Sequence, residues 1–76
     1  TKIDFDLPFD SKVTISIYDM TGREVMTLLN GDLKTSGYYT MNINASALSS
    51  GTYFYTMKAE GGNNNFVQTK KMMLVK

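Results

Sequence analysis

Residues 12–22 read KVTISIYDMTG, and this stretch decides the fold. Positions 13–17 alternate between apolar and polar side chains, which is the two-residue period of a strand with one buried face. Asp19 then offers a carboxylate that can bond to its own backbone, and Gly22 tolerates a positive φ, so a tight hairpin turn is expected. The stretch therefore predicts an antiparallel sheet with short connections.

The same alternation recurs along the rest of the chain. It predicts further strands at residues 3–7, 23–29, 39–43, 53–59 and 66–75. About six or seven strands separated by turn signals at intervals of roughly 8–12 residues are typical of a β-sandwich. We therefore expect an all-β fold, an immunoglobulin-like antiparallel β-sandwich of about seven short strands, filling a single domain from residue 1 to 76.

The connections follow from turn chemistry. The apolar phase of the third predicted strand slips after Met26, which indicates a β-bulge. Asn30-Gly31 predicts a type I′ hairpin turn, because both residues accept the left-handed conformation. Residues 45–50 are small and polar and fit a turn or one short helical turn, and residues 61–65 read as the loop of the last hairpin.

Composition excludes several classes of function. With 42% hydrophobic and 20% charged residues the chain is an ordinary folded domain, and its net charge of +1 attracts neither nucleic acid nor an anionic membrane. No apolar run approaches the ~20 residues of a membrane helix, so no direct membrane insertion is expected. Histidine and cysteine are absent, so the commonest general base and the best nucleophile are missing. We predict neither an enzyme nor a cofactor.

Two carboxylates are nevertheless candidates for a catalytic or metal-binding role. Asp4 and Asp6 would project from one face of a strand, as a hydrolytic pair requires, but strand alternation explains them more simply. With Asp10 they could offer oxygens to Ca²⁺, yet the spacing of a calcium-binding loop is missing, so no metal site is predicted. Residues 44–46 match the N-glycosylation pattern, which we interpret as chance.

Aromatic residues offer another kind of site, a platform on which sugars stack, as in carbohydrate-binding modules. Core and cross-strand packing is the favoured interpretation, because aromatic residues are ordinary strand residues. If Tyr53 and Tyr55 face the core, Phe54 must point outward. The aromatic residues concerned are Tyr38, Tyr39, Tyr53, Phe54 and Tyr55.

The last seven residues, KKMMLVK at 70–76, carry apolar side chains on both faces of a strand. One face of such a strand is either buried a second time or offered to a partner, and a sandwich this small favours the partner. Our hypothesis is that the outward apolar residues, bracketed by lysines, form a docking surface to which a partner adds a strand. The lysines alone would also serve to discourage edge pairing, and an exposed edge permits self-association.

Five segments, taken in order, resemble the type A C-terminal sorting domains of the type IX secretion system. They are residues 1–8, 12–19, 21–25 (TGREV), 48–55 (LSSGTYFY) and 70–76. Ser49 departs from the family, many of whose members have proline there, and this should loosen the turn before Gly51. The chain also resembles the immunoglobulin-like domain of the flagellar hook-capping protein.

The resemblance implies a sandwich at the C-terminus of a cargo protein, recognised by the outer-membrane translocon in a Gram-negative bacterium of the Bacteroidota. A sortase-like peptidase would cut upstream of the domain, and the cargo would reach the cell surface or the medium. We interpret Thr1 as a cleavage boundary, with the cargo preceding it. A hook-capping type of structural module and a carbohydrate-binding module remain the alternatives. The residues expected to carry the sorting signal are Gly22, Arg23, Gly51, Tyr53, Lys70, Lys71, Met72, Met73, Leu74, Val75 and Lys76.

Overall fold

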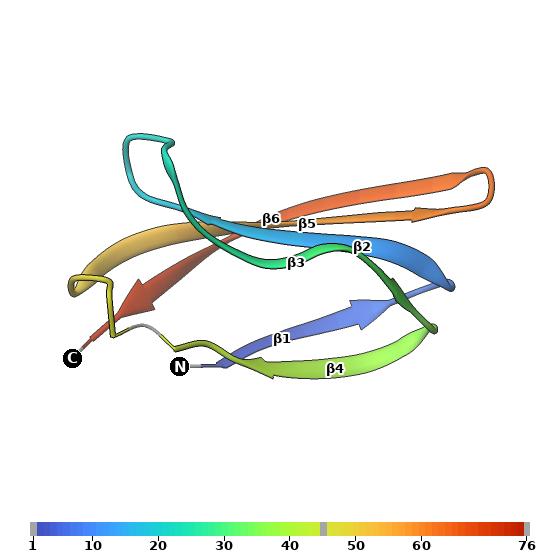
Figure 1. The fold of residues 1–76 in the computed structure, drawn as a ribbon, viewed down its shortest axis with the longest axis horizontal. Helices are drawn as coiled ribbons and strands as arrows, with labels where there is room; N and C mark the ends of the chain where they lie inside the picture. Colours follow the sequence, from blue (N-terminus) through green and yellow to red (C-terminus); the bar gives the residue numbers. More distant parts are fainter. Residues whose placement is uncertain (1, 45, 76) are drawn as a thin grey trace.

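The computed structural model describes residues 2–44 and 46–75, and these residues form six strands in two layers (Figure 1). One layer is a four-stranded antiparallel sheet in the order β3-β2-β5-β6, and the other is the antiparallel pair β1-β4. The strands are β1 (Lys2–Leu7), β2 (Ser11–Tyr18), β3 (Glu24–Lys34), β4 (Gly37–Asn42), β5 (Gly51–Gly61) and β6 (Asn64–Leu74).

The predicted sandwich is confirmed, with six strands in place of about seven. Three of the six are eleven residues long, so they are longer than the alternation suggested. The predicted loop at residues 61–65 shrinks to Gly62 and Asn63, because the flanking residues pair as Gly61 with Asn64. Residues 46–50 form a turn, and Ala45 lies outside the described residues.

The hairpin turn predicted at Asn30-Gly31 is wrong. β3 runs through both residues and stays paired with β2 from end to end. Gly31 does have a positive φ of 71°, but the ladder steps from Val13–Asp32 to Thr14–Asn30, so Gly31 is the extra residue of a bulge. Its N–H donates to the Thr14 hydroxyl at 3.1 Å. Gly31 therefore bends β3 at a bulge and does not reverse the direction of the chain.

The bulge predicted after Met26 is confirmed. The ladder between β2 and β3 shifts between Ile15–Leu29 and Ser16–Thr27, so Leu28 is unpaired. A further shift between Ile17 and Tyr18 increases the irregularity of this strand. The bulges explain why the apolar residues of β3 do not keep a strict two-residue period.

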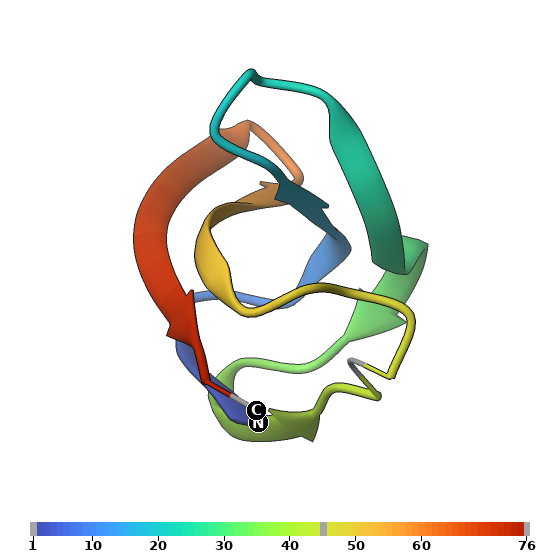
Figure 2. The same ribbon diagram turned by 90° about the vertical axis from the view of Figure 1, so that its left-hand side faces the viewer.

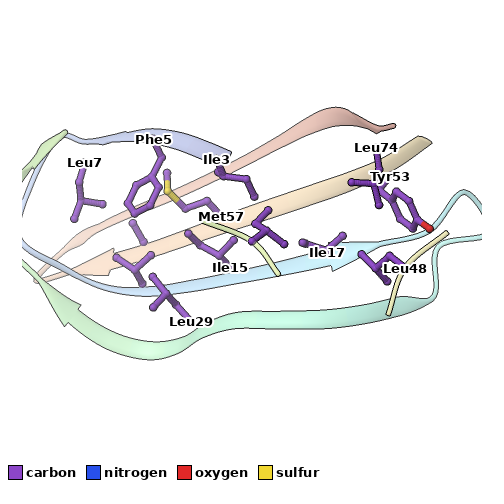
Figure 3. Packing of buried hydrophobic residues seen from close by; sticks show 13 residues of the cluster. Ile3, Phe5, Leu7, Ile15, Ile17, Leu29, Leu48, Tyr53, Met57 and Leu74 are labelled. Atoms are coloured by element: carbon purple, nitrogen blue, oxygen red, sulfur yellow. The ribbon is translucent and has the colours of Figure 1, made fainter. Parts of the chain in front are cut away.

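The core lies between the two layers (Figure 3); every strand but β4 contributes buried apolar side chains, and β4 packs the partly buried Tyr39 and Met41 against them. Its centre is β2, where Val13, Ile15 and Ile17 are completely buried. The buried apolar residues are Ile3, Phe5, Leu7, Val13, Ile15, Ile17, Leu29, Ile43, Leu48, Tyr53, Met57, Ala59 and Leu74. Two strands cover four, so some side chains of β5 and β6, including Tyr55, Phe66 and Met72, are only partly buried.

Candidate functional site

β6 is one of the two edge strands of the larger sheet, and β3 is the other. β6 pairs with β5 along its whole length, from Gly61–Asn64 to Gly51–Leu74. Its other edge has no strand partner within the part of the chain that the structure describes. An edge of this kind presents free backbone N–H and C=O groups, which can template the addition of another strand.

The final residues of β6 alternate sharply between the two faces of the sheet. Leu74 is 3% exposed and lies in the core, where Figure 3 shows it beside Tyr53, and Met72 is half-buried on the same face. Met73 is 66% exposed and Val75, directly after the strand, is 84% exposed. Two large apolar side chains in succession on the solvent side are therefore left uncovered by the domain itself.

The lysines of this segment are also on the surface. Lys70 and Lys71 are both exposed, opposite Tyr55 and Phe54 of β5 respectively. Lys71 lies on the same face as Met73, because the two residues are separated by one position. Lys76 falls outside the described residues.

We name the outward side chains of Lys71, Met73 and Val75 the β6 outer face. It continues across the sheet onto β5, where Thr52 lies opposite Met73 and Phe54 lies opposite Lys71. Phe54 is partly exposed, as expected if its neighbours Tyr53 and Met57 are buried.

Gly51 and Tyr53 position this face. Gly51 begins β5 opposite Leu74 with a φ of 154°, a conformation that side chains with a Cβ rarely adopt. Tyr53 is buried, and its hydroxyl donates to the carbonyl of Ser49 at 2.8 Å, which ties the turn before Gly51 to the strand after it. These residues fix where the end of β6 lies, and Tyr53 itself is too buried to meet a partner.

Gly22 and Arg23 lie in the hairpin between β2 and β3. The Asp19 carboxylate accepts hydrogen bonds from the Thr21 hydroxyl at 2.6 Å and from the N–H groups of Thr21 and Arg23 at 2.9 and 3.0 Å. The Arg23 guanidinium, which is 80% exposed, reaches the same carboxylate at 3.3 Å. Gly22 completes the turn with a φ of 88°. The predicted turn is confirmed.

The structure brings these separate segments to one end of the sandwich. Tyr18, the last residue of β2, lies opposite Phe54, which lies opposite Lys71. The hairpin at residues 19–23, the turn at 46–50 and the end of β6 therefore follow one another around the same end, on the left in Figure 1. Segments separated by some fifty positions in the sequence of 76 residues thus share one region of surface.

The hairpin makes a testable pH prediction. Hydrogen bonds from the Thr21 hydroxyl and the Arg23 N–H, the two largest causes, hold the pKa of Asp19 below its ordinary value of 3.8. A lowered folded-state pKa stabilises the fold above the unfolded pKa, and the effect disappears as pH falls through the folded pKa. We expect Asp19→Asn to be less stable than wild type at neutral pH, with the gap closing below about pH 3.8. Urea unfolding followed across this pH range measures the gap, and a gap independent of pH would contradict the assignment.

The aromatic residues considered as a sugar-binding platform do not lie together. Tyr53 is buried, Tyr39 stacks on Phe5 with ring centroids 5.2 Å apart, and Tyr38 stands on the outside of the smaller sheet, so the aromatic residues form no shared platform. A hollow of about 440 Å³ opens at the opposite end of the sandwich, and none of its lining residues is aromatic.

Asp4 and Asp10 accept hydrogen bonds from neighbouring segments of the chain. Asp4 accepts a hydrogen bond from the Thr40 hydroxyl of the neighbouring strand at 2.8 Å, and Asp10 accepts one from the N–H of Ser36 at 2.8 Å. Among the described residues, no three His, Cys, Asp or Glu side chains are grouped so as to hold a metal ion. None of the described residues belongs to a helix with the length and apolarity needed to cross a membrane.

The structure is a two-layer β-sandwich in which the segments singled out in the sequence gather at one end, beside the edge strand β6. The family model described as the secretion system C-terminal sorting domain matches residues 1–75, and the chain belongs to this family. It is a sorting signal for type IX secretion, and it marks proteins that are exported across the outer membrane to the cell surface or the medium. No curated protein and no solved structure matches the chain.

Membership confirms the resemblance seen in the sequence. The family implies interaction with the type IX secretion machinery and with an upstream cargo, and it is not an enzymatic family. The hook-capping and carbohydrate-binding alternatives are not favoured.

Proposed function

We propose that the type IX translocon recognises this domain through the β6 outer face and the open edge of β6. The observation that supports this most strongly is the alternation at its end, where Leu74 is 3% exposed while Met73 and Val75 are 66% and 84% exposed. The domain's own core accounts for the buried face. The uncovered face needs another explanation, and a partner that covers it supplies one.

Strand addition is the binding mode that we propose. A segment of the translocon would pair with the backbone of β6, and side chains on alternate positions would contact Met73 and Val75. Lys70 and Lys71 would fix the register by pairing with acidic side chains, because charge at an interface contributes to specificity and association rate. Lys76, which follows Val75 in the sequence, would add a third positive charge to this segment.

The other sorting residues act by positioning in this proposal. Gly51 and Tyr53 hold the start of β5 opposite the end of β6, and the Gly22–Arg23 turn closes the same end of the sheet. Arg23 is the member of this group with an exposed charge, so it is the one that can also contact the translocon. The whole chain acts as a single module, and a sortase-like peptidase cuts on the cargo side of it.

Site-specific photo-crosslinking tests the proposed contact. A photoreactive amino acid replaces Met73 in residues 1–76 fused to a periplasmically exported reporter, in a bacterium that has the secretion system. The matched control replaces Leu33, an exposed apolar residue, 79%, near the opposite end of the sandwich. We expect a crosslink to an outer-membrane translocon subunit from position 73 and a much weaker one from position 33. Equal crosslinking from both positions, or crosslinking from position 33 alone, would contradict the proposal.

A further inference from the structure

The larger sheet is covered on one side and bare on the other. Figure 2 shows the β1–β4 layer against one side of this sheet, and no second layer lies on the other side within the described residues. The bare side carries the outward side chains of alternate strand positions, among them Ser16 of β2 and Thr56 of β5. It is the same side that carries the β6 outer face.

A crevice of about 40 Å³ lies between β2 and β5 on the bare side, and we name it the β2–β5 crevice. Ser16 and Thr56 lie opposite each other in the ladder, as do Thr14 and Lys58. The crevice is lined by Thr14, Ser16, Tyr18, Thr56 and Lys58. A single water needs roughly 10–15 Å³, so the crevice has room for a few waters or for one small polar group of a partner.

Ser16 has a hydroxyl that the fold itself does not use. Ser11 and Ser16 are the two buried polar residues among those described, at 5% and 6% exposed. The Ser11 hydroxyl donates to the carbonyl of Phe9 at 2.7 Å, whereas the Ser16 hydroxyl has no hydrogen-bond partner within residues 2–44 and 46–75. No side-chain oxygen in these ranges is both fully enclosed and unpaired, so the Ser16 hydroxyl opens onto the crevice.

The other lining groups add hydrogen-bond donors and a positive charge. Thr14 already accepts a hydrogen bond from the N–H of Gly31 at 3.1 Å, and its own hydroxyl hydrogen has no acceptor among the described residues. Lys58 is exposed and forms no ion pair in the described part of the chain. The residues opposite Lys58 in its two ladders, Thr14 and Val67, are both uncharged.

These groups select a small anion. Two free hydroxyl hydrogens and one ammonium group bind acceptor atoms, and a hydrogen bond to a charged group is stronger than one between neutral groups. No acidic side chain lines the crevice, so a cation would find no charged ligand there. The single ammonium matches a single negative charge, and the small volume admits a planar group with two oxygens. The carboxylate of an aspartate or glutamate side chain meets these requirements.

The β2–β5 crevice lies beside the β6 outer face. The hydroxyls of Thr56 and Thr69 are 3.1 Å apart across β5 and β6, and Thr69 is on the same face as Lys71. Neighbouring strands are about 4.8 Å apart, so a strand added to β6 would run about 12 Å from the crevice, beyond the reach of an acidic side chain. The carboxylate must therefore come from a part of the partner that lies over the bare side of the sheet.

We propose that the β2–β5 crevice binds an aspartate or glutamate side chain of the translocon subunit that covers the β6 outer face. Lys58 supplies the opposite charge, and the hydroxyls of Ser16 and Thr14 donate to the carboxylate oxygens. The identity of the partner rests on the proposed function. The crevice gives the partner a second point of attachment away from β6, which fixes the orientation of the folded domain and distinguishes it from an unfolded chain with the same last strand.

Zero-length coupling tests the contact at Lys58. A carbodiimide activates a carboxylate, and an amine in direct contact with it then forms an amide while a urea leaves. Membranes are prepared from cells that secrete the reporter fused to residues 1–76, treated with the carbodiimide and analysed by mass spectrometry. We expect Lys58 to be joined to an acidic residue of an outer-membrane translocon subunit. Lys58→Arg, which keeps the charge but has no amine to couple, should lose this product and keep export within about twofold of wild type.

Ser16→Ala separates recognition from folding. Because the hydroxyl has no partner in the fold, its removal should leave the midpoint of urea unfolding unchanged, while export of the reporter falls several-fold. Lys58→Glu, which sets a negative charge against the partner's carboxylate, should lower export on the order of tenfold. The matched control is Lys2→Glu, the same charge change at an exposed lysine of β1 on the other side of the sandwich, and its export should equal that of wild type.

Two results would overturn the crevice as a binding site and leave the proposed function standing. One is a crosslink from position 73 to the translocon with no carboxylate coupled to Lys58. The other is export of folded Ser16→Ala and Lys58→Glu at the wild-type level, which would show that the crevice holds only water. Failure of position 73 to crosslink to the translocon would instead overturn the proposed function, and with it the partner assigned to the crevice.

Discussion

Leu74→Glu is expected to abolish the folded state. Leu74 is 3% exposed, packs in the core and lies opposite Gly51, so the new carboxylate would be buried with no partner. Burying an unpaired charge costs several kcal/mol, and a chain of 76 residues has only about 4–11 kcal/mol of net stability. Circular dichroism and urea titration should show no cooperative unfolding transition at room temperature.

Met73→Glu provides the matched control for Leu74→Glu. The same substitution one residue away places the carboxylate on the solvent side, where Met73 is 66% exposed. Its free energy of unfolding should stay within about 0.5 kcal/mol of wild type, as is usual for surface substitutions. A one-residue shift of β6 would exchange these two outcomes, because it moves every side chain to the other face. Unfolding by Met73→Glu with tolerance of Leu74→Glu would therefore contradict the register described here.

Much of the fold was predictable because the strands that form it are buried on one face. The alternation at residues 13–17 and 53–59 fixes which side chains enter the core, and the structure buries Ile15 and Met57 as expected. The Asp19–Gly22 turn was predictable for a local reason, since one carboxylate satisfies several N–H and O–H groups within four residues.

The error at Asn30-Gly31 has an equally local cause. A glycine with positive φ serves a type I′ turn and a β-bulge alike, and only the pairing of the next residues distinguishes the two. Here Leu33 and Lys34 continue to pair with β2, opposite Lys12 and Ser11. That pairing depends on long-range contacts, which sequence periodicity does not report.

The candidate site was predictable in its residues but not in its geometry. The sequence shows apolar side chains on both faces of residues 72–75, and the structure decides that the face of Leu74 is inside and the face of Met73 is outside. Which face of β6 is buried depends on which side of the larger sheet the β1–β4 layer covers. The approach of the Gly22–Arg23 turn to the end of β6 likewise depends on strand order, because β2 and β5 lie side by side between them.

Loss of secretion is the other large effect expected. Met73 and Val75 are the exposed apolar residues of the β6 outer face, and replacing both by glutamate removes apolar contact area and reverses the local charge beside Lys71. A few apolar anchors usually dominate an interface, each costing more than about 1 kcal/mol when removed. A loss of about 1.4 kcal/mol lowers binding tenfold, so two such residues should lower export by at least about tenfold.

The matched control is Tyr38→Glu with Leu33→Glu. These residues, on β4 and β3, are 69% and 79% exposed, so the control introduces the same two charges at equally accessible hydrophobic positions away from β6 and from the 19–23 hairpin. Both double variants must show the wild-type unfolding transition before secretion is compared. Any difference in export then reflects recognition, because folding is the same.

The most direct measurement is the amount of reporter in the culture medium, with residues 1–76 fused to a periplasmically exported reporter in a bacterium that has the type IX system. We predict that Met73→Glu/Val75→Glu leaves the reporter in the periplasm, while Tyr38→Glu/Leu33→Glu is secreted like wild type. Equal secretion of the two folded double variants would contradict recognition through the β6 outer face.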